Sequence, residues 1–380
     1  MKVMIDISEL YQVDYVSGIQ RVVIEVTTRW IRDGYNLLLG VYRPDTNAFQ
    51  LADPKAFYEH YQTKQKKKAY LTRNMMPVSQ LDGSYLFFDL DSVWMNMNKR
   101  SYLLPILRKQ GVHIAVHIYD IIPVTHPQFC HELTVLHFID YLGAHLENAE
   151  LVIANAQATL DAVADVASGI RHSFRTEVVP LGSNLPKKKK EGALLPETQR
   201  ILNGSPYILM VGTLEPRKNH RFVLRAFEKA LFSKGLQLVF VGRRGWNMEE
   251  FLDDVENHPE NHHQLWMLEK ASDADVAALY EKAFFVAFAS YNEGFGLPII
   301  EAFHHGTPVL AADIPVLRET GGALADYFSL EDEEGFIQII RHYLDAPRAY
   351  QEKRAGLAQY KGTTWDECAE RMMAALEKLQ

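Results

Sequence analysis

The stretch NEGFGLPIIE at residues 292–301 decides the fold prediction for this chain of 380 residues. It follows the apolar run Phe285–Ala289, which predicts a buried strand, and it leads into residues with helical periodicity. Gly296 allows a backbone turn that a side chain would obstruct, and Pro298 suits the first position of a helix, where no N–H partner is lost. A strand, a glycine turn and a helix in this order are typical of an α/β sheet.

Strand-like and helix-like segments alternate along the whole chain, which predicts parallel sheets with helices on both faces. The expected strands are Lys2–Ser8, Tyr35–Tyr42, Tyr85–Asp89, Val112–Tyr119, Leu151–Ala154, Thr176–Pro180, Tyr207–Gly212, Leu236–Gly242, Gln264–Leu268, Phe285–Ala289 and Pro308–Ala312. The expected helices are Gly18–Asp33, Phe129–Asn148, Ala158–Ala167, His220–Ser233, Asp273–Ala283, Pro298–His305, Glu333–Leu344 and Thr364–Leu379.

The chain is too long for one typical hydrophobic core, so two domains are expected. Residues 182–205 combine prolines, glycines and Lys187–Lys190 with little periodicity, which is typical of a linker. We therefore predict two Rossmann-like, doubly wound domains, at residues 1–185 and 206–362, joined by a linker at 186–205 and facing a central cleft. Ligands of such sheets bind at the carboxyl ends of the strands.

Composition excludes several classes of protein. The net charge of −8 does not favour nucleic-acid binding. Cys130 and Cys368 have no spacing typical of a metal site or a disulfide framework, which fits a reducing cytoplasm and predicts no metal. The N-terminus lacks the pattern of a signal peptide, and no run of about 18 apolar residues occurs. We therefore expect a cytoplasmic protein.

The loop at 292–301 has the groups that a nucleotide sugar requires. Backbone N–H groups of Gly296 and Leu297, at the start of a helix, can bind a diphosphate. Glu301, expected in the first helical turn, can accept hydrogen bonds from ribose hydroxyls, and Glu293 can accept them from the sugar. The alternative is that Glu301 only complements the helix dipole and that the glycines only turn the chain.

The segment VGTLEPRKN at residues 211–219 places two cations after a predicted strand. Arg217 can bind phosphate oxygens in a bidentate manner, and Lys218 supplies a compact charge. Both can stabilise the negative charge that grows on a departing diphosphate. The alternative is a solvated pair with Glu215 as its salt-bridge partner.

Two loops of the first half complete the predicted site. Gly18, where the first strand leads into the first helix, lets the backbone approach a phosphate. Asp120 follows the apolar strand and can bind a sugar hydroxyl or receive the proton of an acceptor. His117 and His126 lie nearby, but each is more simply explained as a structural histidine.

Two basic segments have weaker assignments. Arg243, in VGRRGW at residues 241–246, can flank the nucleotide, or it can belong to a solvated arginine pair. Lys64–Lys68 lies among aromatic residues and can contact anionic lipid headgroups, although a mobile charged loop is the simpler interpretation.

These motifs resemble the retaining glycosyltransferases of family 4, which have the two-domain GT-B fold. EGFGLPIIE at 293–301 is the most specific match, supported by residues 211–219 and 241–246. SGIQRV at 17–22 and YDIIPVTHP at 119–127 resemble the members that act on bacterial surface polysaccharides, including mannosyl- and rhamnosyltransferases.

The resemblance implies a role for each residue. Glu301 would bind the donor ribose, Glu293 the donor sugar, and Arg217 with Lys218 the diphosphate, while Gly18 would approach the phosphates from the first domain. The last helix, within residues 363–380, would cross back onto that domain. Many members have histidine where this chain has Tyr119, which shifts the expected role to Asp120. The resemblance implies neither an enzyme nucleophile nor an essential metal.

The expected activity is retaining transfer of a hexose from a nucleotide diphosphate sugar to a saccharide or a lipid-linked saccharide. GDP-mannose is the first choice of donor by analogy, and a dTDP- or UDP-sugar is the second. Peripheral contact with the inner face of the plasma membrane is a further expectation. The alternatives are a nucleotide-sugar epimerase and a non-catalytic sugar-binding partner subunit.

Overall fold

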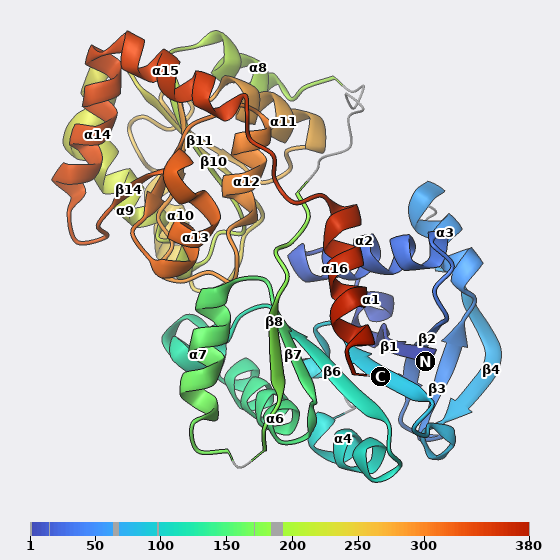
Figure 1. Cartoon of the computed structure of the whole chain (residues 1–380). Coiled ribbons are helices and arrows are strands. Elements are labelled where there is room, and N and C mark those ends of the chain that lie inside the picture. Colours follow the sequence, from blue (N-terminus) through green and yellow to red (C-terminus); the bar gives the residue numbers. More distant parts are fainter. Residues whose placement is uncertain are drawn as a thin grey trace. The chain divides into compact units, whose positions relative to one another are not determined.

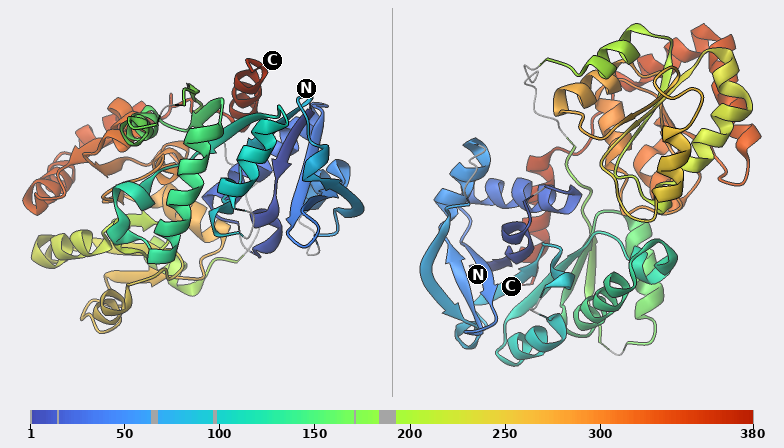
Figure 2. Two further views of the ribbon diagram at one scale, coloured as in Figure 1. Left: turned by 90° about the horizontal axis from the view of Figure 1, so that it is seen from below. Right: turned by 180° about the vertical axis from the view of Figure 1, so that it is seen from behind.

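The computed structural model describes residues 2–14, 16–63, 68–96, 99–170, 172–183 and 193–379. The chain divides into two compact units, each with its own sheet (Figures 1 and 2). Unit 1 comprises Met1–Gly182 and Thr363–Gln380, and unit 2 comprises Ser183–Gly362.

The sheet of unit 1 has the strand order β4-β3-β2-β1-β5-β6-β7-β8. Strands β2, β1, β5, β6, β7 and β8 pair in parallel with their neighbours in this order. Strand β3 pairs with β2, and β4 pairs with β3, in the antiparallel direction. The sequence prediction missed β3 and β4, and β4 is a partly exposed edge strand without apolar alternation. The strands are β1 (Lys2–Asp6), β2 (Leu37–Arg43), β3 (Ala48–Ala52), β4 (Leu71–Pro77), β5 (Tyr85–Asp89), β6 (His113–Ile118), β7 (Leu151–Ala154) and β8 (Arg175–Val178).

Helices cover both faces of this sheet, and the side chains of two neighbouring residues of β5 point to opposite faces. Phe87 belongs to the core that also contains buried leucines of α4 and aromatic residues of α6, whereas the Phe88 ring lies 6.0 Å from that of Trp30 in α2. The period of two in side-chain direction explains this division. The helices are α1 (Ser8–Gln12), α2 (Gly18–Arg32), α3 (Pro54–Thr63), α4 (Arg100–Lys109), α5 (Ile122–Thr125), α6 (Glu132–Asn148), α7 (Gln157–Ala167) and α16 (Trp365–Glu377).

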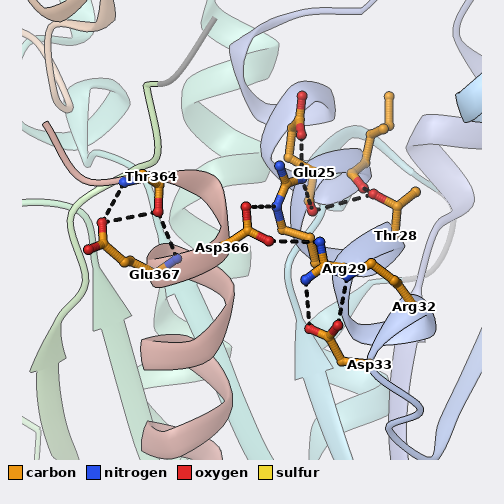
Figure 3. Close-up of polar contacts among 9 residues, drawn as sticks. Glu25, Thr28, Arg29, Arg32, Asp33, Thr364, Asp366 and Glu367 are labelled. Atoms are coloured by element: carbon orange, nitrogen blue, oxygen red, sulfur yellow. Dashed lines mark hydrogen bonds and ion pairs between the residues drawn. The ribbon is translucent and has the colours of Figure 1, made fainter. Parts of the chain in front are cut away.

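The last helix, α16, packs against α2 within unit 1. The buried Trp30 side chain donates from Nε1 to the carbonyl of Ala369 at 2.8 Å. At the rim, Asp366 contacts Arg29 and Arg32, and Thr364 with Glu367 forms a capping box at the helix start (Figure 3). These ion pairs are partly exposed, so the buried aromatic contact contributes more to the docking.

Lys68 has a structural role that differs from the predicted lipid contact. Its Nζ donates to the carbonyls of Leu10 and Tyr11, each at 2.9 Å, and to that of Val13. It therefore caps the carboxyl end of α1, where a cation is favourable. Lys64–Lys67, the rest of that segment, lie outside the described residues. Among the residues that the structure describes, none of the helices has both the length and the apolar character to cross a membrane.

The sheet of unit 2 is entirely parallel, with the order β11-β10-β9-β12-β13-β14. The chain builds outward from β9 to β10 and β11, and then resumes with β12 on the other side of β9. The strand order therefore reverses between β9 and β12, where ligands of open α/β sheets bind. The strands are β9 (Tyr207–Val211), β10 (Gln237–Val241), β11 (Leu265–Leu268), β12 (Phe285–Phe288), β13 (Val309–Ala312) and β14 (Asp326–Phe328).

The helices of unit 2 include one in the predicted linker. Helix α8 spans Pro196–Asn203, within the segment 186–205 that the sequence analysis assigned to the linker. Proline favours its first turn, Thr198 and Ile201 are buried, and Asp275 accepts a hydrogen bond from the N–H of Leu195 at 2.8 Å. The others are α9 (His220–Ala226), α10 (Glu249–Glu256), α11 (Asp273–Lys282), α12 (Leu297–His304), α13 (Pro315–Gly321), α14 (Glu333–Asp345) and α15 (Pro347–Leu357).

Gly242 allows the loops that follow β9 and β10 to touch through their backbones. A Cβ atom at this position would lie 1.8 Å from the carbonyl oxygen of Gly212. Replacing Gly242 with alanine must therefore displace a loop that carries candidate site residues. We expect Gly242→Ala to lower the free energy of unfolding by about 1–3 kcal/mol, measured by denaturant titration.

The matched control is Gly143→Ala in helix α6, where an added Cβ meets nothing within 4 Å. Alanine is the better helix former, so this variant is expected to be more stable by about 0.5–1 kcal/mol. Equal unfolding midpoints for the two variants would contradict the close backbone approach at Gly242.

Candidate active site

The reversal of strand order in unit 2 brings two loops together. The loop at residues 212–219 follows β9, and the loop at 289–296 follows its neighbour β12. The N–H of Tyr291 donates to the carbonyl of Arg217 at 2.9 Å, and Arg217 Nη1 donates to the carbonyl of Asn292 at 2.5 Å. Segments that are 75 positions apart in sequence are thereby joined at the carboxyl edge of the sheet.

An ion cluster occupies this junction. Oε1 of Glu293 lies 2.8 Å from Arg217 Nη1 and 2.5 Å from Lys218 Nζ. Arg217 Nη2 also contacts the carboxylate of Glu215. The side chains of Arg217, Lys218 and Glu293 are only 14%, 13% and 10% exposed, and that of Glu215 is 7% exposed. The structure therefore brings together three residues that the sequence analysis assigned to one donor site, with Glu215 beside them.

The environment of Glu293 keeps its carboxylate charged. Burial alone would raise the pKa of Glu293 above its ordinary value of 4.5. The nearby charges of Arg217 and Lys218, with the hydrogen bond from Lys218, outweigh burial and lower this pKa to about 2. Such a group accepts hydrogen bonds and is a poor general base near neutral pH. The pKa of the buried His220 is lowered to about 3 by burial and by Lys218, so it adds no charge.

The start of α12 supplies backbone donors. Gly296 has φ +94° and precedes the helix, where a side chain would be strained and would approach Leu317 Cδ2 at 3.1 Å. The N–H groups of Gly296 and Leu297 donate to no other group in the described part of the chain. Pro298 is the second residue of the helix, not the first as predicted, and it has no N–H of its own. Two donors therefore remain for an anion.

Glu301 is the fifth residue of α12, so its predicted place in the first turn was wrong by one turn. Its Oε2 accepts a hydrogen bond of 3.1 Å from the hydroxyl of the buried Tyr280. The Tyr280 ring stacks on His305, with centroids 5.4 Å apart. Because dipole effects fade beyond the first turn, the simple dipole explanation of Glu301 loses weight. Tyr280 was missed by the sequence analysis, since a tyrosine on α11 carries no motif.

Arg243 lies in the loop after β10, beside the loop after β9. Its carbonyl accepts a hydrogen bond from the N–H of Leu214 at 2.9 Å, and its side chain is exposed. The adjacent Arg244 makes surface ion pairs with Glu256 and Glu269. The backbone of Arg243 therefore supports the cationic loop, whereas a contact between its side chain and a nucleotide stays a prediction.

The predicted residues of unit 1 lie at the carboxyl ends of its own strands. Asp120 follows β6, and its Oδ1 accepts a hydrogen bond from the N–H of Ile122 at 3.0 Å, at the start of α5. His117 is buried, which lowers its pKa to about 3, and its ring lies 4.3 Å from that of Tyr119. His126 contacts the neighbouring Thr125 hydroxyl at 2.9 Å. Asp120 has a structural contact, and its role toward an acceptor stays a prediction.

Gly18 is the exposed first residue of α2. The start of this helix is fixed by Gln20, which contacts the Ser17 hydroxyl and donates to Ser92 Oγ at 2.8 Å. Nearby strands β1 and β5 mark the reversal of strand order in unit 1. Their final residues Asp6 and Asp89 both pair with the buried Arg100, a contact that the sequence analysis missed. The sequence signal that could have indicated this contact is an aspartate at the end of each apolar strand.

The described residues contain no cluster of histidine, cysteine, aspartate or glutamate side chains arranged to hold a metal ion. The candidate site consists of the cations Arg217 and Lys218, the carboxylates of Glu215, Glu293 and Glu301, and backbone donors.

Residues 195–361 match the model of the family described as "Glycosyl transferases group 1". This part of the chain is therefore similar to that family. The matched residues contain the ion cluster, the glycine turn before α12 and Glu301.

Two curated relatives from Escherichia coli are mannosyltransferases by name. A serotype-specific mannosyltransferase, WbdA, is 29% identical over 370 residues, which cover 90% of this chain and 41% of the relative. O-antigen chain mannosyltransferase B is 28% identical over 272 residues, which cover 69% of each protein. The first relatives found are WbdA proteins, and the chain spans only 41–46% of their length.

A solved structure with the same fold is that of Anabaena Alr3699/HepE in complex with UDP-glucose. It aligns over 100% of both chains with a TM-score of 0.69 and 18% sequence identity. At this level of identity the likeness shows the fold. The chain therefore has the GT-B fold, with two α/β domains and mainly parallel sheets.

The ion cluster predicts a pH-dependent stability for Glu293→Gln. The pKa of Glu293 is lower in the folded chain than its ordinary value of 4.5, so its stabilisation is present above that value and is lost as the pH falls toward about 2. We expect the variant to lose about 2–3 kcal/mol of unfolding free energy near neutral pH. The difference from the wild type should fall to less than half near about pH 3.

Denaturant titrations of both proteins at several pH values measure this difference. The matched control is Glu333→Gln, which removes a carboxylate paired with Arg225 at the surface, 2.6 Å away. A Glu293→Gln difference that does not change with pH would contradict the lowered pKa.

Proposed function

We propose that this chain binds a nucleotide diphosphate sugar in unit 2 and transfers the hexose, with retention of anomeric configuration, to a saccharide or a lipid-linked saccharide. This transfer would be a step in the synthesis of a surface polysaccharide. The match of residues 195–361 to the family model and the mannosyltransferase names of the relatives support this proposal.

The proposal rests on the cluster of Arg217, Lys218 and Glu293, which forms where the loops after the neighbouring strands β9 and β12 meet. A diphosphate requires fixed cations and backbone donors, and the sugar that it carries requires a hydrogen-bond acceptor nearby. The two cations and the N–H groups of Gly296 and Leu297 meet the first need. The carboxylate of Glu293, whose pKa is lowered to about 2 by the charges of Arg217 and Lys218, meets the second.

The proposed chemistry follows from where charge develops. As the bond between the sugar and the diphosphate breaks, negative charge grows on the departing oxygen. Arg217 and Lys218 are held in place before the reaction, so they can stabilise this charge more strongly than they stabilise the bound donor. Glu293, with its low pKa, would hold hydroxyls of the sugar, and Glu301, oriented by Tyr280, would hold those of the ribose.

The proposed donor is GDP-mannose, since the curated relatives are mannosyltransferases by name. A UDP-sugar is the second candidate, because the structural neighbour was solved with UDP-glucose, and a dTDP-sugar such as dTDP-rhamnose is the third. Arg243 is proposed to lie near the nucleotide.

Gly18 and Asp120 of unit 1 are proposed to serve the phosphates and the acceptor, respectively. The proposed compartment is the cytoplasm, with peripheral contact to the inner face of the plasma membrane when the acceptor is lipid-linked. Two alternative functions would use the same site. A nucleotide-sugar epimerase would convert one nucleotide sugar into another without an acceptor, and a non-catalytic partner subunit would bind a sugar without turnover.

The proposal predicts release of a nucleoside diphosphate from one nucleotide sugar of a panel that includes GDP-mannose, UDP-glucose and dTDP-rhamnose. We expect Arg217→Ala and Lys218→Ala each to lower this turnover at least about tenfold, because each removes a charge partner of the leaving group. The matched control is Arg225→Ala, which removes an arginine from a surface ion pair with Glu333. This control should retain wild-type turnover.

Thermal unfolding of each variant checks that the fold is intact. Turnover close to the wild-type value in both Arg217→Ala and Lys218→Ala would refute the assigned role. Binding of a nucleoside diphosphate without any turnover of the panel would favour the partner-subunit alternative, and interconversion of donor sugars would favour the epimerase.

A further inference from the structure

Glu215 has a position that the proposed site does not yet explain. Its side chain is buried, it directly precedes the turn Pro216–Lys218, and its carboxylate contacts Arg217 Nη2. We propose that Glu215 is a positioning residue of the donor site, which orients Arg217 and balances one of the two cations until a diphosphate binds. This inference rests on the proposed function.

The orienting role follows from the directions in which a guanidinium donates. The group is planar, with donors in a fixed fork. Nη1 of Arg217 points to Glu293 and to the carbonyl of Asn292, and Nη2 points to Glu215. Contacts on both terminal nitrogens fix the plane of the group. A cation held in one orientation before the reaction needs no reorganisation when charge develops.

Glu215 also acts on Lys218, but through its backbone. The N–H of Lys218 donates to the carbonyl of Glu215 at 3.0 Å and closes the short turn. One residue therefore fixes the orientation of the guanidinium and the backbone from which the ammonium extends. Both contacts lie within one loop, so they do not depend on the loop after β12.

The charge-balancing role follows from the sum of the cluster. Arg217 and Lys218 carry two positive charges, and Glu215 and Glu293 carry two negative charges, so these four side chains are neutral together. All four are largely buried, where an excess charge is costly. Without the carboxylate of Glu215 the cluster would carry one net positive charge and would hold a diphosphate product more tightly.

Three variants separate the two roles. Glu215→Gln removes the negative charge but keeps an oxygen that can accept a hydrogen bond from Arg217. Glu215→Ala removes both the charge and the hydrogen-bond acceptor. Glu215→Asp keeps the charge but shortens the side chain, so it should lose the contact. The measurements are the dissociation constant of the nucleoside diphosphate that the wild type binds, kcat and KM for the donor, and the thermal midpoint.

We expect Glu215→Gln to bind the nucleoside diphosphate at least about threefold more tightly than the wild type. Glu215→Ala and Glu215→Asp should each lower kcat at least about tenfold, with a smaller change in KM for the donor. A side chain that serves only stability would lower the thermal midpoint and would not tighten product binding. The control Glu333→Gln should change neither binding nor kcat.

Product binding by Glu215→Gln that is unchanged or weaker would overturn the charge-balancing role, and wild-type kcat in Glu215→Asp would overturn the orienting role. If Glu215→Gln does not fold, the aspartate variant still decides the orienting role. Failure of the wild type to bind GDP, UDP or dTDP would instead refute the proposed function itself, so the two failures are distinguishable.

Discussion

One carboxylate oxygen is the point on which the candidate site depends. Oε1 of Glu293 forms ion pairs with both Arg217 and Lys218, and these contacts join the loop after β9 to the loop after β12. Neither loop fixes the cluster alone, because the cations belong to one and the acceptor to the other. The low pKa of Glu293 is the electrostatic consequence, since two cations stabilise its ionised form despite burial.

The strand order explains why these loops meet. Strands β9 and β12 are neighbours in the sheet of unit 2 although β10 and β11 lie between them in sequence. In open α/β sheets, ligands bind at such a reversal of strand order. The close approach at Gly242 then holds the cationic loop from its other side. The fold therefore supplies the preorganisation that binding of a charged donor requires.

Much of unit 2 was predictable because its signals are local. An apolar strand followed by GFGLP predicted the turn and helix α12, and EPRKN after another strand predicted the two cations. The missed contacts are those with no local pattern. Tyr280 reaches Glu301 from a different helix, and the inter-loop ion pairs depend on a strand order that periodicity does not encode. Edge strand β4 and helix α8 were missed because their apolar residues are few.

The proposed role of the ion cluster is to bind a diphosphate. Calorimetric titration of the chain with a nucleoside, its monophosphate and its diphosphate tests this role directly. If the cluster holds a diphosphate, the second phosphate should improve affinity at least about tenfold, and added salt should weaken that gain. Equal affinities for the monophosphate and the diphosphate would contradict the account.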